Sequence, residues 1–245
     1  MTHQLQDYED YLILKNFSPA TRSMYLRTLK RFLRFCKSKY PGQHLSQELA
    51  KQYIIYRKKQ NRSWSTLNCD YSSLRKYFRE VIHKEWTLRK IPRPRRTRIL
   101  PQILSLQDIT KLINHASTYK HQVFICFVYA TGLRLSEATG VKLSDIDRNR
   151  LQIRVSQGKG GKDRYIQIPK VLIEILEDYY RHYRPEKYLF NGWNIGDRYC
   201  TSSGQWTMRQ AKKKSNISKQ ASVHTLRHAY ATHHLEERPI PQGQV

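Results

Sequence analysis

Three short segments of the chain carry basic and imidazole side chains in arrangements that suit phosphate chemistry. The first, ATGLRLSEATGVKLSDID, places Arg134 directly after a glycine turn and at the start of an expected helix. The second, GKGGKDR, places Lys159 and Lys162 on a tight turn. The third, HTLRH, places His224 and Arg227 one turn apart on the same face of a helix.

Together these side chains provide the groups that a phosphodiester needs for transfer. Two arginines can each bind the non-bridging oxygens through a planar guanidinium. A lysine on a turn can deliver a proton to a departing sugar oxygen, and a histidine can hold or transfer a proton near neutral pH. Because charge builds on the phosphoryl oxygens in the transition state, fixed guanidinium groups lower the barrier without a metal.

Each segment also has a purely structural explanation. Arg134 could cap a helix or pair with Glu137, GKGGK could be an ordinary turn, and His224 could be a half-buried histidine with a hydrogen-bond partner. His224 and His228 lie at i and i+4, as metal ligands can, but no HExxH motif and no third ligand accompany them. The three segments in combination favour a phosphate site, and we predict no metal.

The net charge indicates a polyanionic partner. The chain has 45 Lys and Arg against 19 Asp and Glu, which gives +26 and an isoelectric point of 10.1. Such an excess repels itself unless a polyanion neutralises it, so nucleic acid is the expected partner. The longest apolar run, VFICFVYA, is too short to span a bilayer, and the N-terminus carries acidic residues where a secretion signal needs basic and apolar ones. We therefore expect a soluble cytoplasmic protein that does not act at membranes.

The N-terminal part has the pattern of several helices, which we expect over residues 18–39, 46–60 and 63–83. Ser18 and Pro19 provide the N-cap and first position of one of them. No acidic residue lies between Ser18 and Glu48, whereas a helix face that is merely solvated would mix signs. We predict that this face contacts DNA through Arg22, Arg27, Lys30 and Arg31.

A basic, proline-containing segment over residues 89–104 separates two parts of different texture. Its prolines exclude a continuous helix, and its basic residues suit contacts with phosphates. Arg93, Arg95 and Arg96 are the predicted DNA contacts there. The predicted domains are therefore 1–88, a helical DNA-binding domain, 89–104, a linker, and 105–245, a catalytic domain.

The C-terminal part has helical periodicity over 105–138, with a break near Lys120. Two strands then flank Gly158–Gly161 as a hairpin, and helices are expected over 170–183, 205–214 and 222–236. The predicted fold class is mainly α with one small antiparallel sheet, an α+β chain. The four cysteines form no CxxC pair, so we expect reduced, buried thiols.

The motifs TGLRLSE, GKGGKDR and HTLRHAYATHHLE, in this order, resemble those of the tyrosine recombinase (phage integrase) family, above all its Xer-type and integron-type branches. NFSPATRSMYLRTLKRFLRFC is similar to the helical core-binding, SAM-like domain of these enzymes. The resemblance extends from Tyr8 to Glu236. It implies a C-shaped clamp around double-stranded DNA, strand cleavage by a tyrosine through a 3′-phosphotyrosyl intermediate, no metal and no high-energy cofactor.

The resemblance also assigns roles to individual residues. A first catalytic arginine, a supporting acid, a hairpin lysine proposed as general acid and a His-x-x-Arg pair correspond, in that order, to Arg134, Glu137, Lys159, His224 and Arg227. Lys162 and Arg164 are assigned to DNA contact, and His228 to packing or to orienting the helix. The family implies a homo-oligomer on DNA, and a bacterial, nucleoid-associated protein of a mobile element or of chromosome resolution.

The end of the sequence departs from the family pattern. Family members continue through a Leu-Gly-His-like helix to the nucleophilic tyrosine, whereas here Glu237 is followed by RPIPQGQV. We expect Tyr230 to pack in the core, so no nucleophile is assigned, and we expect DNA binding with impaired strand cleavage. Two alternatives stay open: a non-catalytic DNA-binding accessory or competitor protein, and a type IB topoisomerase, against which the Xer-like N-terminal domain argues.

Overall fold

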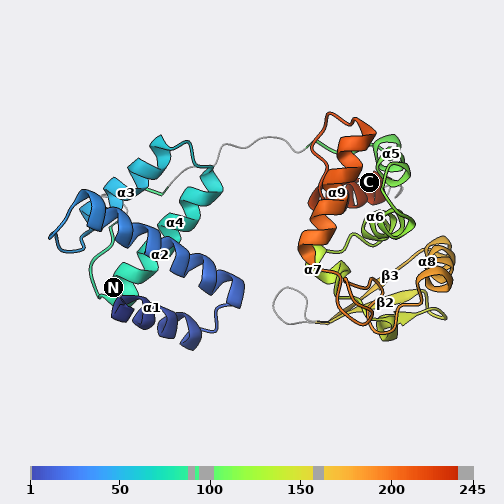
Figure 1. Cartoon of the computed structure of the whole chain (residues 1–245), viewed down its shortest axis with the longest axis horizontal. Helices are drawn as coiled ribbons and strands as arrows, with labels where there is room; N and C mark the ends of the chain where they lie inside the picture. Colours follow the sequence, from blue (N-terminus) through green and yellow to red (C-terminus); the bar gives the residue numbers. More distant parts are fainter. Residues whose placement is uncertain (1, 88–91, 94–101, 157–162, 237–245) are drawn as a thin grey trace, which may run out of the picture. The chain divides into compact units, whose positions relative to one another are not determined.

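The structure, a computed structural model, describes residues 2–87, 92–93, 102–156 and 163–236, and it divides into two compact units, Met1–Ile99 and Leu100–Val245 (Figure 1). Each unit has its own hydrophobic core. The boundaries at 88 and 105 stay a prediction. None of the helices in the described ranges combines the length and apolar composition that crossing a lipid bilayer requires.

The first unit is a helical bundle (Figure 1). Its elements are α1 (Thr2–Leu14), α2 (Pro19–Lys39), α3 (Gln47–Lys59), α4 (Trp64–Lys76) and a π-helical turn, η1 (Tyr77–Val81). Three serines begin α2, α3 and α4, because each side chain accepts the free backbone amide three residues later; they are Ser18, Ser46 and Ser63.

The helix expected over 63–83 is therefore two elements. The α-helical pattern ends at Lys76, and the amide of Ile82 donates to the carbonyl of Tyr77, five residues back. Two consecutive aromatic side chains, Tyr77 and Phe78, are buried in the core at this wider turn.

A buried carboxylate joins three helices of the first unit. Asp70 on α4 is fully buried and accepts from Thr28 of α2 at 3.0 Å. Its second oxygen accepts from Arg57 of α3 at 3.0 Å, and Arg31 of α2 donates to the first oxygen at 3.2 Å. Because both cations meet one carboxylate, the buried charge is neutralised and the helices are held in register.

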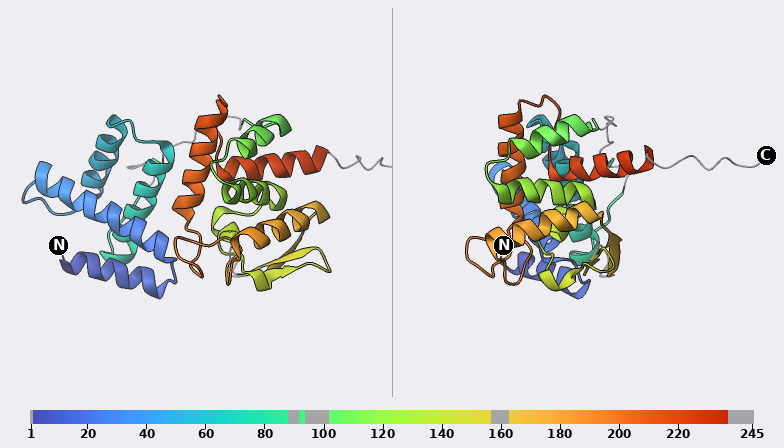
Figure 2. Two further views of the ribbon diagram at one scale, coloured as in Figure 1. Left: turned by 45° about the vertical axis from the view of Figure 1, so that its right-hand side comes forward. Right: turned by 90° about the vertical axis from the view of Figure 1, so that its right-hand side faces the viewer.

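The second unit packs helices against one another, with a small sheet at one edge (Figure 1). Its elements are α5 (Leu106–Asn114), α6 (Tyr119–Thr131), α7 (Leu135–Ala138), η2 (Leu143–Asp145), β1 (Ile146–Asp147), β2 (Gln152–Val155), β3 (Arg164–Gln167), α8 (Lys170–Tyr183), α9 (Thr201–Ser215) and α10 (Val223–Glu236). The sheet is antiparallel in the order β1-β2-β3, with Val155 paired to Arg164 next to the hairpin turn. Figure 2 shows α10 lying against α6, and Arg227 of α10 contacts Gly132 at the end of α6.

The predicted fold class is confirmed, with differences at particular elements. The sheet gains β1, which at two residues is too short to leave an alternating pattern. The break in the helical stretch lies at 115–118, just before Lys120, because Thr118 caps α6. Helix α9 begins at Thr201 rather than 205, since the sulfur of Cys200 accepts the amide of Ser203 and acts as the N-cap.

The prediction of buried thiols is right for one cysteine and wrong for another. All four thiols are free, and Cys36 is buried. Cys69 and Cys126 are half-buried, and Cys200 is exposed because its N-cap position lies at the surface end of α9.

Candidate active site

A glycine turn between α6 and α7 positions the first predicted catalytic arginine. Gly132 has φ +57° and its amide closes α6 by donating to Val128. A Cβ at this position would overlap the ring of Tyr230 on α10, so both the backbone conformation and the space require glycine. Two residues later Arg134 is the N-cap of α7.

The carboxylate of Glu137 holds Arg134 and also Arg164. It accepts the backbone amide of Arg134 and its Nη1, each at 2.9 Å. From β3, Arg164 donates Nη1 and Nη2 to the two carboxylate oxygens at 3.1 and 2.9 Å. Glu137 thus joins the start of α7 to the base of the β2–β3 hairpin, and four donors meet its two oxygens.

The carboxylate of Glu137 is charged at neutral pH and in moderately acidic solution, because its pKa is low. Its side chain is only 6% exposed, and burial alone would raise the pKa of Glu137. The hydrogen bonds from Arg164 and from the backbone and side chain of Arg134 outweigh that effect and lower the pKa to about 2. The two guanidinium groups and one carboxylate therefore carry a net charge of +1 at neutral pH.

The second predicted arginine, Arg227, contacts the same Gly132 turn from α10. Arg227 on α10 donates Nη1 to the carbonyl oxygen of Gly132. This hydrogen bond joins α10 to the residues that lead into Arg134, so the two predicted phosphate-binding arginines depend on one turn. That Arg134 and Arg227 act on one phosphate stays a prediction.

His224 lies one turn before Arg227 on α10, exposed at the surface. Burial, His228 and the cations Arg227 and Arg134 lower the pKa of His224, in that order of size. Its ring Nε2 lies 3.0 Å from that of His228, and the two rings meet edge to face. His228 therefore contacts the candidate catalytic histidine directly, which the sequence did not predict.

Two of the predicted site lysines lie outside the described residues. Lys159 and Lys162 fall in residues 157–162, between β2 and β3 in the sequence. Arg95 and Arg96, in residues 94–101, lie outside the described residues as well. The structure describes the strand ends on either side, where Val155 and Arg164 pair. Arg164 donates to Glu137, and its predicted contact with DNA stays a prediction.

The described side chains of the first unit that were predicted to contact DNA lie in three different surroundings. Arg22, Arg27 and Lys30 line one surface hollow on α2, beside Glu9 of α1. Arg31 is half exposed and donates to Asp70, so part of its guanidinium faces inward. Arg93 donates to Asn68 at 2.8 Å and lies in a second hollow.

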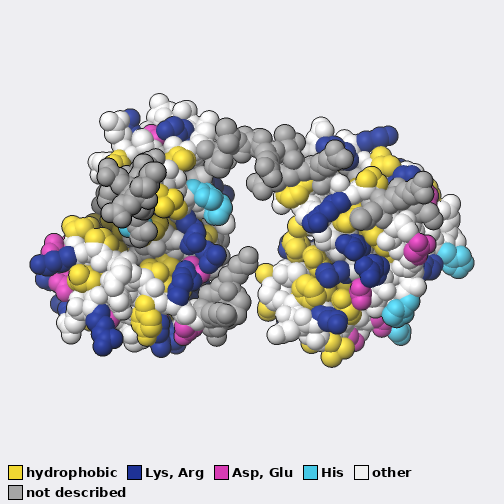
Figure 3. Space-filling model, turned by 180° about the vertical axis from the view of Figure 1, so that it is seen from behind, with side chains coloured by type: hydrophobic (Ala, Val, Ile, Leu, Met, Phe, Trp, Pro, Cys, Tyr) yellow, Lys and Arg dark blue, Asp and Glu magenta, His cyan; other side chains and the backbone are white. Residues whose placement is uncertain are grey.

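That second hollow holds basic residues that the sequence did not single out. They lie on α4 and η1 beside Arg93: Arg75, Lys76 and Arg79. Their i, i+1 and i+4 spacing was a usable signal, because it places three cations near one helix face. On the face drawn in Figure 3, Lys and Arg side chains spread over both units and outnumber Asp and Glu.

Arg198, which the sequence did not single out, forms hydrogen bonds at the end of α7. It donates Nε to the carbonyl oxygen of Thr139 at 3.2 Å and Nη2 to the hydroxyl of Thr139 at 3.1 Å, and it reaches the carbonyl oxygen of Ser136. These bonds satisfy acceptors at the end of α7 that a four-residue helix leaves free. No sequence pattern links Arg198 to residues about sixty positions earlier.

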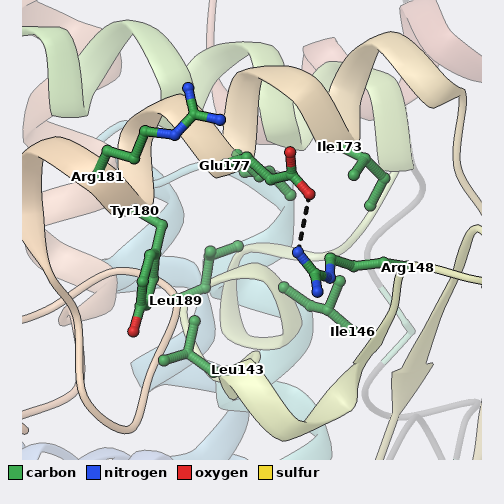
Figure 4. Close-up of a pocket in the computed structure, with 9 residues that line it drawn as sticks. Leu143, Ile146, Arg148, Ile173, Glu177, Tyr180, Arg181 and Leu189 are labelled. Carbon is green, nitrogen blue, oxygen red and sulfur yellow. Dashed lines mark hydrogen bonds and ion pairs between the residues drawn. The ribbon is translucent and has the colours of Figure 1, made fainter.

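An apolar pocket of about 450 Å³ lies on α8, and none of the predicted catalytic residues lines it (Figure 4). Its walls include Leu143, Ile146 and Ile173, and the ion pair between Arg148 and Glu177, 3.0 Å long, lies at its edge. Within the described ranges, no three His, Cys, Asp or Glu side chains gather as metal ligands.

Comparison with known proteins agrees with the site. The phage integrase family matches residues 102–242, and the N-terminal SAM-like domain of phage integrases matches residues 5–88. The chain therefore belongs to the phage integrase family, as its motifs indicated.

Two relatives match nearly the whole chain. A putative integrase/recombinase, y4qK of Sinorhizobium fredii (strain NBRC 101917 / NGR234), is 34% identical over 96% of this chain and 77% of that protein. The tyrosine recombinase XerA of Thermococcus kodakarensis (strain ATCC BAA-918 / JCM 12380 / KOD1) is 29% identical over 95% and 81%. Among solved structures, a lambda integrase tetramer bound to a Holliday junction shares the fold, with TM-score 0.79 and 19% identity over 96% of this chain and 73% of that one.

Proposed function

We propose that the chain is a site-specific DNA recombinase of the tyrosine type, acting on double-stranded DNA. The observation that carries this proposal is that Arg227 of α10 donates to the carbonyl of Gly132, two residues before Arg134, with His224 one helical turn from Arg227. Two fixed guanidinium groups and an imidazole suit a phosphodiester, and the net charge of +26 suits a duplex.

The proposed reaction follows from these groups. A tyrosine hydroxyl attacks the phosphorus, a phosphotyrosine bond forms, and the bond to the 5′ oxygen breaks to leave a 5′ hydroxyl. Arg134 and Arg227 stabilise the charge on the non-bridging oxygens, and His224 holds or transfers a proton. Lys159 is proposed to protonate the departing oxygen. Attack by the 5′ hydroxyl of another strand reverses the steps and rejoins DNA.

We also propose how the protein assembles and where it acts. The DNA complex and tetramer named for the lambda integrase structure support a homo-oligomer on DNA. Basic side chains of the first unit, Arg22, Arg27, Lys30 and Arg93, are proposed to contact phosphates together with Lys162, Arg95 and Arg96. Since its proposed substrate is DNA, the place of action is the bacterial cytoplasm, on the nucleoid.

The test is incubation of the full chain with a nicked suicide duplex, followed by a denaturing gel. An adduct of protein and DNA that survives denaturant would show that the chain itself supplies the nucleophilic tyrosine, and Arg227→Ala should then abolish it. If binding falls steeply with salt but no adduct forms, the chain is a DNA-binding protein without cleavage activity. Binding that does not change with salt would contradict the DNA-binding proposal itself.

The non-catalytic alternative has one observation in its favour. Two tyrosines near α10 have their own partners: the hydroxyl of Tyr129 lies 3.0 Å from His233 Nδ1, and Tyr230 stacks on His234. Both are proposed as packing residues, so a nucleophile among the described residues of this region is not assigned.

A further inference from the structure

One carboxylate, that of Glu137, binds two arginines at the same time. Glu137 accepts four hydrogen bonds, two from Arg134 and two from Arg164, and its side chain is nearly buried. Such a group has no lone pair left over for a substrate. Its role is therefore to hold the two arginines.

The two arginines use their guanidinium groups differently. Arg164 turns both terminal nitrogens toward Glu137, in the paired geometry that carboxylates favour. Within the described part of the chain, Arg134 commits Nη1 to Glu137. Arg134 therefore keeps a terminal nitrogen, Nη2, for a phosphate, whereas Arg164 directs both of its terminal nitrogens to Glu137.

Charge gives Arg164 a second effect on the site. A lone Glu137 would form a one-to-one pair with Arg134 and neutralise the group that must bind an anion. A second guanidinium on the same carboxylate offsets this and leaves the group at +1. It also divides the carboxylate's attraction between two cations, so Arg134 keeps its electrostatic effect on a phosphate.

We propose that Arg164 is a positioning residue, which through Glu137 fixes Arg134 for the scissile phosphate and ties the base of the β2–β3 hairpin to α7. That the ligand is a DNA phosphate rests on the proposed function. The contacts that join Arg134, Glu137 and Arg164 do not depend on it. The proposal gives Arg164 a role different from the predicted contact with DNA, and the dependence of DNA affinity on salt separates the two roles. Because Arg164 pairs with Val155, the contact with Glu137 also anchors the ends of β2 and β3 that face each other.

The chain offers a matched control on the same hairpin. Arg154 on β2 pairs with Asp145 at 3.0 and 3.2 Å and is about as exposed as Arg164. Arg154→Ala therefore removes one cation and one ion pair from the same sheet without touching Glu137. Arg164→Lys keeps the charge but loses the planar pair of donors, and it serves as the second variant where alanine unfolds the hairpin.

The measurement is NMR of the full chain with labelled arginine and glutamate side chains. In Arg164→Ala and Arg164→Lys we expect the Arg134 guanidinium signals to move and broaden, and in the alanine variant the pKa of Glu137 to rise by about one pH unit. Arg154→Ala should leave both unchanged. Unchanged Arg134 signals in both Arg164 variants, or full restoration by lysine, would overturn the proposal.

Salt-dependent DNA binding separates positioning from direct contact. A positioning role predicts that Arg164→Ala keeps the wild-type dependence of affinity on salt, as Arg154→Ala does. A direct phosphate contact instead predicts a slope reduced by about 1 in Arg164→Ala, which would overturn the proposal. A wild-type chain that binds no DNA would contradict the proposed function, while the Arg134 signals would still decide the role of Arg164.

Discussion

The Nε2 atoms of His224 and His228 lie 3.0 Å apart, which leaves room for only one hydrogen between them. One ring must donate and the other accept, so the two rings adopt different tautomers. A proton added to His224 at Nε2 would face His228 and lie near Arg134 and Arg227, and these neighbours, together with burial, lower the pKa of His224.

Replacement of His228 by phenylalanine should raise the pKa of His224. The shift should be partial, because burial and the cations Arg227 and Arg134 still lower it. Imidazole nitrogen shifts followed over about pH 5 to 8 measure this directly. His234→Phe, on the same helix but stacked on Tyr230, is the control and should leave His224 unchanged. A titration of His224 that is identical in His228→Phe and the wild type would contradict the pairing.

Gly132→Ala should destabilise the second unit by about 2–4 kcal/mol, because the residue has positive φ and its Cβ would overlap Tyr230. Gly196→Ala isolates the backbone part, since Gly196 has φ +84° but its Cβ meets only Glu186 at 3.9 Å. That variant should cost about 1 kcal/mol. Hydrogen exchange of α6 amides gives both free energies.

The overlap has its own test. In a Tyr230→Ala background the ring is gone, so the added cost of Gly132→Ala should fall to that of Gly196→Ala. A cost that does not depend on Tyr230 would show that the backbone conformation alone requires glycine.

Cys200 should be alkylated at neutral pH while Cys36 is not. Hydrogen bonds from the hydroxyls of Ser202 and Ser203 and from the Ser203 amide lower the pKa of Cys200 to about 7, and burial raises that of Cys36 to about 11. Because the thiolate is the reactive form, the rate at Cys200 should reach half its maximum near pH 7. Iodoacetamide labelling read by mass spectrometry checks this, with Cys200→Ser as control. A rate that rises only above about pH 8.5 would show an ordinary thiol.

Asp70→Ala should cost the first unit about 3–5 kcal/mol, since Arg57 is then buried without its carboxylate. Hydrogen exchange of α3 and α4 amides measures the loss. Glu48→Ala is the matched control: it removes an exposed carboxylate 3.8 Å from Lys51 and should cost less than about 1 kcal/mol. Equal effects of the two substitutions would mean that the buried network contributes little.

Arg134→Ala and Arg227→Ala should keep most of the DNA affinity of the wild type. Many other basic residues share the backbone contacts, and these two are proposed to act on one phosphate. The triple variant Arg22→Ala, Arg27→Ala, Lys30→Ala should instead weaken binding and reduce the salt slope by about 3. Titration of duplex DNA at several salt concentrations measures both. A loss of binding in Arg134→Ala as large as in the triple variant would refute the division of roles.

Local signals account for much of the fold. The Ser18-Pro19 start of α2 and the start of α5 after Ser105 follow from side chains that accept free backbone amides nearby. Where such a signal was unusual, the prediction failed: α9 begins four residues early because a cysteine, not a serine, caps it. The π turn after Lys76 was missed because helical periodicity alone does not reveal it.

The site was predictable only in part, for a physical reason. Arg134, His224 and Arg227 follow from motifs of adjacent residues. The partner of Arg164 is a carboxylate 27 positions earlier, and only the folded sheet brings them together. The contact between Arg227 and the Gly132 carbonyl spans 95 positions, so spacing in the sequence does not reveal it.

The pairing of Val155 with Arg164 has a consequence for how this hairpin can vary. Both ends of the intervening segment are fixed, one by the strand ladder and the other by Glu137 as well. A one-residue insertion within β2 or β3 would therefore do more harm than a substitution there, because a shift of register turns the strand's side chains to the opposite face and would take Arg164 away from Glu137.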